Sequence, residues 1–424
     1  MVVHIFLFIL FFSLLIWHNK HNTFFINSGL TTKQIFFLFV LKVTISILYI
    51  YIDQNFFYGG DLDTFYTESI YETDLLLSDP KEFFTSFFIS DIGYSNFFYT
   101  DSFWNNFRTV FLYKLLAVFN LLSFKNIYIN SLLYNYLIFY GHVLLFKVFC
   151  MVWPTKKTAI LMGCFLLPSS LFYLSGINKD SIFFLGMAIT LYSICLLFVL
   201  KKKSVNVFIL LLLGLTLTVI IRNFFFVLFL PTTIALIFSI KYKAYSYKIV
   251  AVIFGVCILI FLCSPLLMQI VSTRQHDFLA LGWAKSALKV DVLQPTFTSF
   301  ITYFPTALNI AFFRPYIWDS YSIFYFAGAL ETLLLLIFIL LNLFYAKSTR
   351  IFTQLKSPII LFCIFYGATA ILIIGYSIPI LGASVRYRTA FLPLLFTPLL
   401  CIFPFYKITW LYKIYTTYKK YLVA

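Results

Sequence analysis

The sequence predicts an all-α, polytopic membrane protein, and three observations lead to this class. The chain of 424 residues is 62% hydrophobic and only 11% charged. Apolar stretches of about 17–25 residues recur along it, each long enough to cross a hydrocarbon core of about 30 Å as a helix. The short segments of alternating polarity that are typical of a membrane β-barrel are not visible. We therefore expect one integral membrane domain over residues 1–424.

The apolar stretches and the polar breaks between them define about eleven transmembrane spans. Residues 2–17 lack the basic region and the small-residue cleavage site of a signal peptide, so we expect them to remain as a span. Residues 204–240 show almost no polar break, and one helix of that length would extend about 55 Å, too far for a single crossing. We therefore expect a tight hairpin at Arg222–Asn223. The spans are placed at residues 2–17, 35–52, 128–152, 159–174, 181–200, 205–221, 223–240, 249–270, 321–345, 358–378 and 389–406.

With eleven spans, the connecting segments fall into two alternating sets that differ in charge. One set carries lysine and arginine but no acidic residue, and it ends with the basic tail 407–424. The other set includes the long segments 53–127 and 271–320 and holds every acidic residue except Glu331, which falls within a span. Because cytoplasmic connections are enriched in Lys and Arg, the first set is predicted to be cytoplasmic. The net charge of +16 is scattered over helix ends, which argues against a nucleic-acid partner.

One apolar run is not counted as a span. Residues 107–124 contain Arg108 and Lys114, and counting them as a crossing would place Lys156 and Lys157 outside the cell. We expect an amphipathic helix that lies on the outer membrane surface. A re-entrant segment is the alternative.

Two carboxylates stand out in the first long outer segment. The stretch YGGDLDTFY, residues 58–66, places Asp61 and Asp63 directly after a glycine pair. Glycines permit a tight turn that brings the backbone close to a ligand. A carboxylate near the membrane surface can act as a general base or bind a divalent cation such as Mg²⁺ or Mn²⁺. The alternative is that both carboxylates are ordinary solvated loop charges.

Basic residues at the predicted outer ends of spans are candidates for binding an anion. Lys179 lies in SGINKD, where a plain turn with a charge pair is the alternative. Arg222 lies among apolar residues, where a guanidinium is costly unless it snorkels or meets an anion. Arg386 and Arg388, in GASVRYRTAFLP, lie at the outer end of the last span. Paired guanidiniums suit a phosphate, and interfacial anchoring is the alternative.

The remaining sequence features mainly exclude classes of protein and kinds of site. The outer segment 271–320 adds His276 and Arg314 as candidate substrate contacts, without a recognisable motif. Neither a phosphate-binding P-loop nor a dinucleotide-binding glycine motif is present, which disfavours a nucleotide-driven pump. The seven cysteines lie in apolar segments without paired spacing, which argues against disulfide or metal-binding roles.

Taken together, the hydrophobic polytopic chain, the acidic motif in its first large outer segment, the surface helix there and the arginine pair before the last span resemble the GT-C glycosyltransferases. The resemblance implies transfer of a sugar from a polyprenyl-phosphate donor to an acceptor on the outer face of the membrane. It implies that Asp61, with Asp63 as the second choice, acts as a base or metal ligand. It also implies that Arg386 and Arg388 hold the donor phosphate.

The chain also departs from the pattern of that family. The catalytic segment of the family usually follows the first span, whereas here it follows the second, which implies an extra N-terminal helix. The usual paired-acid spelling is replaced by the D-x-D of residues 61–63. We add Lys179 and Arg222 as phosphate-binding candidates, although they have no fixed counterpart in the family.

The expected function is a membrane glycosyltransferase of envelope polysaccharide or glycoconjugate assembly, in a bacterial inner membrane, with its active site on the outer face. Its partners would be the bilayer, the lipid-phosphate sugar and a glycan or lipid-linked acceptor. One alternative is an O-antigen-type polymerase or ligase, which would use Arg274, His276 and Arg314 and would not need Asp61. Another is a flippase or transporter of lipid-linked saccharides, which predicts charges within several spans and internal repeats. Few charges lie within the predicted spans, and no repeat is obvious.

Overall fold

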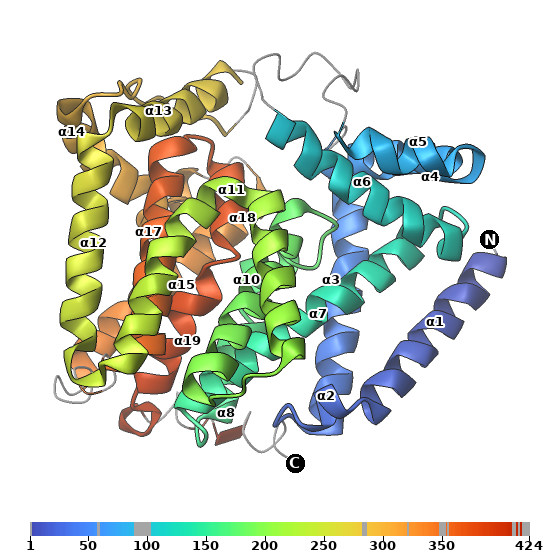
Figure 1. Ribbon diagram of the computed structural model, residues 1–424, viewed down its shortest axis with the longest axis horizontal. Helices are drawn as coiled ribbons and strands as arrows, with labels where there is room; N and C mark the ends of the chain where they lie inside the picture. Colours follow the sequence, from blue (N-terminus) through green and yellow to red (C-terminus); the bar gives the residue numbers. More distant parts are fainter. Residues whose placement is uncertain are drawn as a thin grey trace. The chain divides into compact units, whose positions relative to one another are not determined.

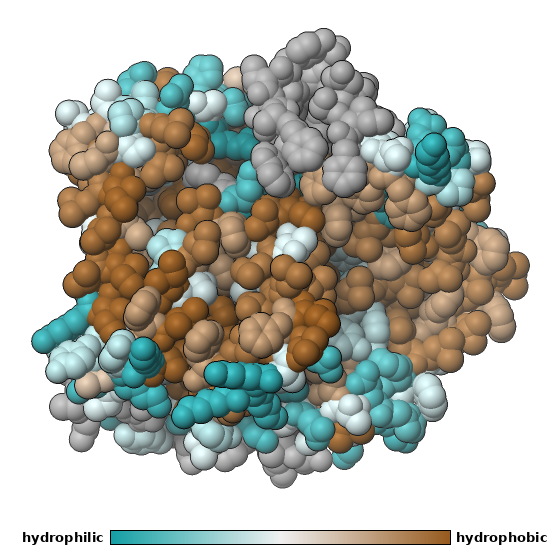
Figure 2. All heavy atoms as spheres, in the orientation of Figure 1, coloured by the Kyte–Doolittle hydropathy of each residue, from teal (hydrophilic) through white to brown (hydrophobic). Residues whose placement is uncertain are grey.

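The chain is a polytopic helical membrane protein, as its hydropathy predicted. Eight described helices are long and apolar enough to cross a membrane, and a bent pair of helices would make a ninth. On the face drawn in Figure 2, hydrophobic residues cover the sides of the long helices, and hydrophilic residues gather near helix ends. The computed structural model describes residues 2–56, 60–88, 103–281, 286–319, 322–346, 353, 356–408, 413 and 416–417. Over these residues the regular secondary structure is helical, and an isolated antiparallel bridge joins Ala287 and Ile380.

Contacts between residues divide the chain into two compact units. Unit 1 comprises Met1–Val148, Leu171–Leu197 and Lys202–Phe224. Unit 2 comprises Phe149–Ser170, Phe198–Lys201 and Phe225–Ala424. Several helices continue past these boundaries, so the units are groups of packed helices within one chain.

Unit 1 combines long apolar helices with a group of shorter ones. Figure 1 shows α4 and α5 lying across the end of α3, with α6 beside them. The helices that lie wholly or partly in unit 1 are α1 (Val2–His21), α2 (Thr23–Ile26), α3 (Thr32–Phe56), α4 (Asp61–Ser78), α5 (Pro80–Thr85), the 3-10 turn η1 (Ser86–Phe88), α6 (Phe103–Ser123), α7 (Ile127–Val152), α9 (Pro168–Tyr173), α10 (Lys179–Ile194), the π-helical turn η2 (Cys195–Val199) and α11 (Val205–Lys241).

Unit 2 contains the remaining helices. Figure 1 shows α13 lying across the end of the long helix α12. The elements of unit 2, besides the second part of α11, are α8 (Lys157–Phe165), η3 (Lys243–Tyr245), α12 (Ser246–Cys263), α13 (Pro265–Ala280), α14 (Phe297–Leu308), the π-helical turn η4 (Asn309–Phe313), η5 (Ile317–Asp319), α15 (Ile323–Tyr345), α17 (Pro358–Ser377), α18 (Leu381–Arg388), α19 (Leu392–Ile402) and η6 (Phe405–Lys407).

Helical geometry breaks at three places within or beside the predicted crossings. The segment 159–174 is divided between α8 and α9, because Pro168 has no N–H to continue the helical ladder and instead starts a new helix. The backbone leaves helical geometry at Arg222, with φ −144° and ψ 64°, where the sequence predicted a hairpin. Helices α18 and α19 meet at a bend of 61°. Length and composition of the described helices support eight or nine crossings, so the predicted number of about eleven spans stays a prediction.

Helices α4 and α6 pack face to face. The buried residues of α4 recur every three or four positions, which places them on one side of the helix. Asp61 and Asp63 lie in the first turn of α4, where the helix dipole favours negative charge. A helix was predicted over residues 107–124, and α6 confirms it. Helix α6 is not among the helices that meet the length and hydropathy criteria for a span.

A buried ion pair joins α6 to the helices around it. Lys114 is 2% exposed and its Nζ donates to Glu72 Oε2 at 2.7 Å, to the carbonyl oxygen of Phe83 at 2.6 Å and to Ser86 Oγ at 2.9 Å. The three ammonium protons therefore all have acceptors. Burial and the nearby Glu72 carboxylate raise the pKa of Glu68. Lys114 is thus buried between helices, and the position of α6 relative to the membrane surface stays a prediction.

Helices α10 and α11 approach each other closely within unit 1, and we expect a leucine at Gly214 to separate them. A Cβ atom at Gly214 would lie 2.7 Å from the backbone nitrogen of Thr190, a distance that requires the helices to move apart. Small residues allow such close approach of membrane helices. Gly214→Leu should lower the apparent melting temperature in detergent by several degrees. Gly255→Leu is the matched control, since a Cβ there meets no atom within 4 Å, and an equal loss in both variants would contradict the prediction.

Candidate functional site

A short loop between α9 and α10 packs against α3 and leads into a polar cluster. A Cβ atom at Gly176 would lie 2.6 Å from the ring of Tyr49, so only glycine lets the loop approach this closely. Asn178 then caps α10, because its Oδ1 accepts a hydrogen bond from the backbone N–H of Ser181 at 2.9 Å. The start of α10 is therefore held in place by its own sequence and by α3.

Buried polar groups of the long helices hold the same loop. Lys42 of α3 is 2% exposed, and its Nζ donates to the carbonyl oxygen of Leu174 at 2.8 Å and to Ser175 Oγ at 3.3 Å. The Nζ atom also lies 3.4 Å from Nε2 of His142 on α7. Asn135 of α7 donates from Nδ2 to the carbonyl oxygen of Ser175 at 2.8 Å. Such partners are what a polar side chain needs inside an apolar helix bundle.

The loop contacts α7 about two helical turns after the first residue of that helix. Tyr134 donates from its hydroxyl to the carbonyl oxygen of Asn178 at 2.5 Å. Tyr134 follows Ile127, the first residue of α7, by about two turns, which corresponds to about 10 Å along the helix axis. The charged residues that begin α10 are therefore near one end of the long helices rather than at their middle.

The first turn of α10 contains an ion pair with the broken helix α11. Nη2 of Arg222 donates to Asp180 Oδ1 at 2.5 Å, and the two side chains are 13% and 5% exposed. The sequence left open whether Arg222 snorkels or meets an anion, and the structure gives it a carboxylate of the same chain. The break in α11 at Arg222 places this side chain at a helix end, where it can reach α10.

Lys179 connects α10 to the layer of short helices. Its Nζ donates to Thr109 Oγ1 of α6 at 2.6 Å and lies 5.3 Å from the ring centroid of Phe65 on α4. Asp61 precedes Phe65 by four residues on α4, and residues at this spacing are neighbours on a helix surface. The structure thus brings Lys179 to the part of α4 that carries Asp61. Arg222 belongs to the same cluster through Asp180.

The two predicted carboxylates occupy different sides of their helix. Asp61 and Asp63 are exposed residues of α4, and positions two apart are about 200° apart around the helix axis. They therefore do not form a chelating pair for a divalent cation. Within the described ranges, no group of three His, Cys, Asp or Glu side chains is close enough to hold a metal ion.

The two arginines that were predicted to bind a phosphate as a pair, both in unit 2, also lie on different sides of their helix. Arg386 and Arg388 are two positions apart on α18, so they point in different directions around the helix. Arg388 is 3% exposed and donates to the carbonyl oxygen of Arg314 at 2.8 Å and to Thr332 Oγ1 at 2.6 Å. The Arg386 guanidinium lies 5.1 Å from the ring centroid of Tyr387. The structure brings Arg388 and Arg314 together, and Arg386 stays the more accessible guanidinium of the pair.

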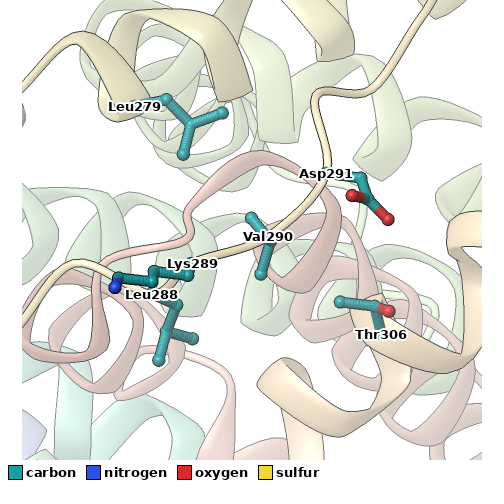
Figure 3. A pocket seen from close by; sticks show the side chains of 6 residues that line it. All are labelled: Leu279, Leu288, Lys289, Val290, Asp291 and Thr306. Atoms are coloured by element: carbon teal, nitrogen blue, oxygen red, sulfur yellow. The ribbon is translucent and has the colours of Figure 1, made fainter.

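The segment after α13 forms an open pocket in unit 2. The pocket has a volume of about 540 Å³. Figure 3 shows Asp291 and Thr306 on one side of it and Lys289 on the other. His276 is exposed on α13 and is not among the residues that line this pocket. The structure therefore gives the predicted outer segment 271–320 a polar pocket but does not bring His276 into it.

Sequence reasoning missed several residues that build the unit 1 cluster. Neither the role of Tyr134 nor that of Asn135 was predicted, and His142 was also overlooked. The signal was present, because these polar residues recur at helical spacing within the apolar helix α7. The pairing of Asp180 with Arg222 had no local signal, since the two residues belong to different helices.

Comparisons with known proteins complete the description of the site. The chain matches no protein-family model, no curated protein and no solved structure. A functional proposal therefore depends on the geometry of the residues themselves.

Proposed function

We propose that the protein is a membrane glycosyltransferase that transfers a sugar from a polyprenyl-phosphate donor to a glycan or lipid-linked acceptor. The reaction would take place on the outer face of a bacterial inner membrane, in the assembly of an envelope polysaccharide or glycoconjugate. The proposal extends the GT-C-like layout expected from the sequence to the residues that meet in unit 1.

One observation carries the proposal: Lys179 joins the start of α10 to the acid-bearing helix α4. Its ammonium contacts Phe65, one turn after Asp61, and it lies at the N-terminus of an apolar helix. A helix N-terminus and a lysine both favour a bound phosphate. The phosphate of a membrane lipid lies at the end of the apolar helices, and the acceptor reaches that depth from the aqueous side. A base and an anion-binding group that lie within about one or two helical turns of each other could serve the two substrates together. The base would act on the acceptor, and the anion-binding group would hold the donor phosphate.

The proposed reaction needs a base and a group that stabilises the leaving phosphate. The Asp61 carboxylate accepts the proton of the acceptor hydroxyl as the hydroxyl oxygen attacks the anomeric carbon of the sugar. The bond between that carbon and the phosphate oxygen breaks, and its electron pair remains on the lipid phosphate. Lys179 stabilises the developing negative charge through its ammonium group.

The other predicted basic residues have secondary roles in this scheme. Arg222 is already paired with Asp180, so we assign it mainly to holding the first turn of α10 in position. Arg388 donates to protein oxygens within unit 2, which suits a structural role, and the assignment of Arg386 to a phosphate stays a prediction from the sequence. Asp63 faces away from the side of α4 that carries Asp61, so we assign the base to Asp61.

We expect Asp61→Asn to lower sugar transfer by at least about 100-fold, because loss of a general base typically costs 10²–10⁴ in rate. The purified protein would be given radiolabelled polyprenyl-phosphate sugars together with an extract of lipid-linked and polysaccharide acceptors. Transfer of label to the acceptor is the measured quantity. Asp63→Asn separates the two carboxylates, and Asp74→Asn is the control for loss of one exposed negative charge on the same helix.

The outcomes distinguish the mechanism from the function. Full transfer by Asp61→Asn, with a loss in Asp63→Asn, would move the base to the other carboxylate. Full transfer by both variants would contradict a carboxylate base on α4. If the wild-type protein transferred no sugar from any polyprenyl-phosphate donor, the polymerase, ligase and flippase alternatives would replace the proposed function.

A further inference from the structure

A cleft with a mostly apolar lining and two lysines lies at the opposite end of α3 from α4. The end of α1 and the start of α3 enclose a volume of about 280 Å³. Its polar lining comes from Asn19, Lys20, Thr32 and Lys33, and the lysines are exposed. The connecting stretch 18–34 contains no Asp or Glu. The two lysines therefore give the cleft a positive charge, and their connecting segment carries no carboxylate.

Asn19 is the buried polar side chain of this cleft. It is 4% exposed, and within the described part of the chain neither its Oδ1 nor its Nδ2 has a hydrogen-bond partner. An amide buried in this way costs free energy unless a ligand supplies the missing bonds. Because Asn19 lines the cleft, a ligand there can receive a hydrogen bond from Nδ2.

The start of α3 adds a favourable field for an anion. Thr31 and Gln34 cap this helix reciprocally: the N–H of Thr31 donates to Gln34 Oε1 at 2.8 Å, and the N–H of Gln34 donates to Thr31 Oγ1 at 3.2 Å. The cap fixes the helix start beside the cleft. The N-terminal end of the 25-residue helix then carries a partial positive charge that favours a phosphate.

Apolar side chains continue from the cleft along the outside of α3. Phe36 and Phe37 line the cleft and are 40% and 65% exposed. Exposed aromatic side chains next to a cleft with two lysines match a ligand that has both a phosphate and hydrocarbon chains. A free phosphate ion would use the basic groups but not these rings.

We propose that this cleft binds the phosphate headgroup of an anionic phospholipid, whose acyl chains lie along Phe36 and Phe37. Lys20 and Lys33 pair with the phosphate, and Asn19 donates a hydrogen bond to it from Nδ2. The site is independent of the proposed glycosyltransferase activity and binds a lipid that is not consumed.

Native mass spectrometry of the delipidated full-length protein tests the site. Dioleoyl phosphatidylglycerol and dioleoyl phosphatidylcholine would be added in separate titrations, since they have the same acyl chains and differ in net charge. We expect one phosphatidylglycerol to bind at least about tenfold more tightly than phosphatidylcholine. Lys20→Gln/Lys33→Gln should weaken phosphatidylglycerol binding by about 30-fold, since each basic residue near an anionic lipid contributes about 1 kcal/mol.

Two further variants keep the test specific. Lys241→Gln/Lys243→Gln removes the same charge from another exposed basic turn and should leave the tight binding event unchanged. Asn19→Leu should weaken phosphatidylglycerol binding while leaving the lipid-free protein at least as thermally stable as the wild type, because it removes two polar atoms that lack partners.

Three results would overturn the proposal. Equal affinity for the two lipids would show that charge is not recognised. An equal loss of binding in the Lys241→Gln/Lys243→Gln control would assign the effect to net charge rather than to the cleft. Displacement of the bound phosphatidylglycerol by inorganic phosphate at equal concentration would assign the site to a free phosphate ion.

Discussion

Replacing Lys114 with methionine is expected to cause a larger loss of thermal stability than the removal of an exposed charge from α4–α6. The change leaves Glu72, which is 3% exposed, without its partner at 2.7 Å. It also removes the hydrogen bonds that Lys114 donates to the carbonyl oxygen of Phe83 and to the hydroxyl of Ser86. Removal of one member of a buried ion pair typically costs about 3–5 kcal/mol. We expect the apparent melting temperature in detergent to fall by several degrees, as measured by thermal challenge followed by size-exclusion chromatography.

The chain provides a matched control and a rescue for this variant. Lys125→Met breaks an ion pair with the same helix α4, between Lys125 Nζ and Asp74 Oδ1 at 2.6 Å, but those side chains are 37% and 59% exposed. Exposed pairs contribute about 0–1 kcal/mol, so this variant should remain close to the wild type. The double variant Glu72→Leu/Lys114→Met removes both charges and should recover much of the loss. Equal effects of Lys114→Met and Lys125→Met would refute the argument from burial.

Substitution of Lys179 is the second change with a large expected effect, this time on activity. Lys179→Met removes the ammonium that we assign to the leaving phosphate, and loss of one such group typically lowers the turnover number by about 100- to 1,000-fold. The loss should appear mainly in kcat rather than in KM, because the phosphate gains negative charge as the bond to the sugar breaks. Transfer of radiolabelled sugar at saturating donor concentration measures this effect.

Two companion variants of Lys179→Met separate catalysis from packing. Lys179→Arg keeps the positive charge and should restore part of the activity. Lys81→Met, an exposed lysine of α5, removes the same charge without contact with the cluster and should have little effect. If Lys179→Met raised KM and left kcat unchanged, Lys179 would bind the donor without stabilising the transition state, and its proposed role would be wrong in that respect.

The sequence predicted those features of the fold that depend on hydrophobicity and length. Long uninterrupted apolar segments must form helices in a bilayer, because no other structure satisfies the backbone hydrogen bonds of one segment there. Helices α3, α12 and α15 follow that rule. The break at Arg222 was predicted on similar grounds, since an unbroken helix would have exceeded the thickness of the membrane.

The candidate site was predicted only in part. Lys179, Arg222 and Asp61 were selected because charges are rare in this chain, and the structure brings Lys179 close to α4. Hydrophobic periodicity, however, identifies the buried side of a helix and not its partner. It could not show that positions two apart on α4 or on α18 would face different directions until both segments were known to be helices.

Composition and hydropathy alone therefore indicate a helical membrane protein, and the placement of basic and acidic connections on alternate sides stays a prediction. The partners of its buried charges depend on tertiary packing. Lys114 has the sequence pattern of a charge on a surface helix, yet it is buried against Glu72, which lies on another helix. Arg222 meets Asp180 because α10 and α11 pack together within unit 1. Such pairs form between residues far apart in the chain, and a buried charge is stable only where packing supplies its counterpart.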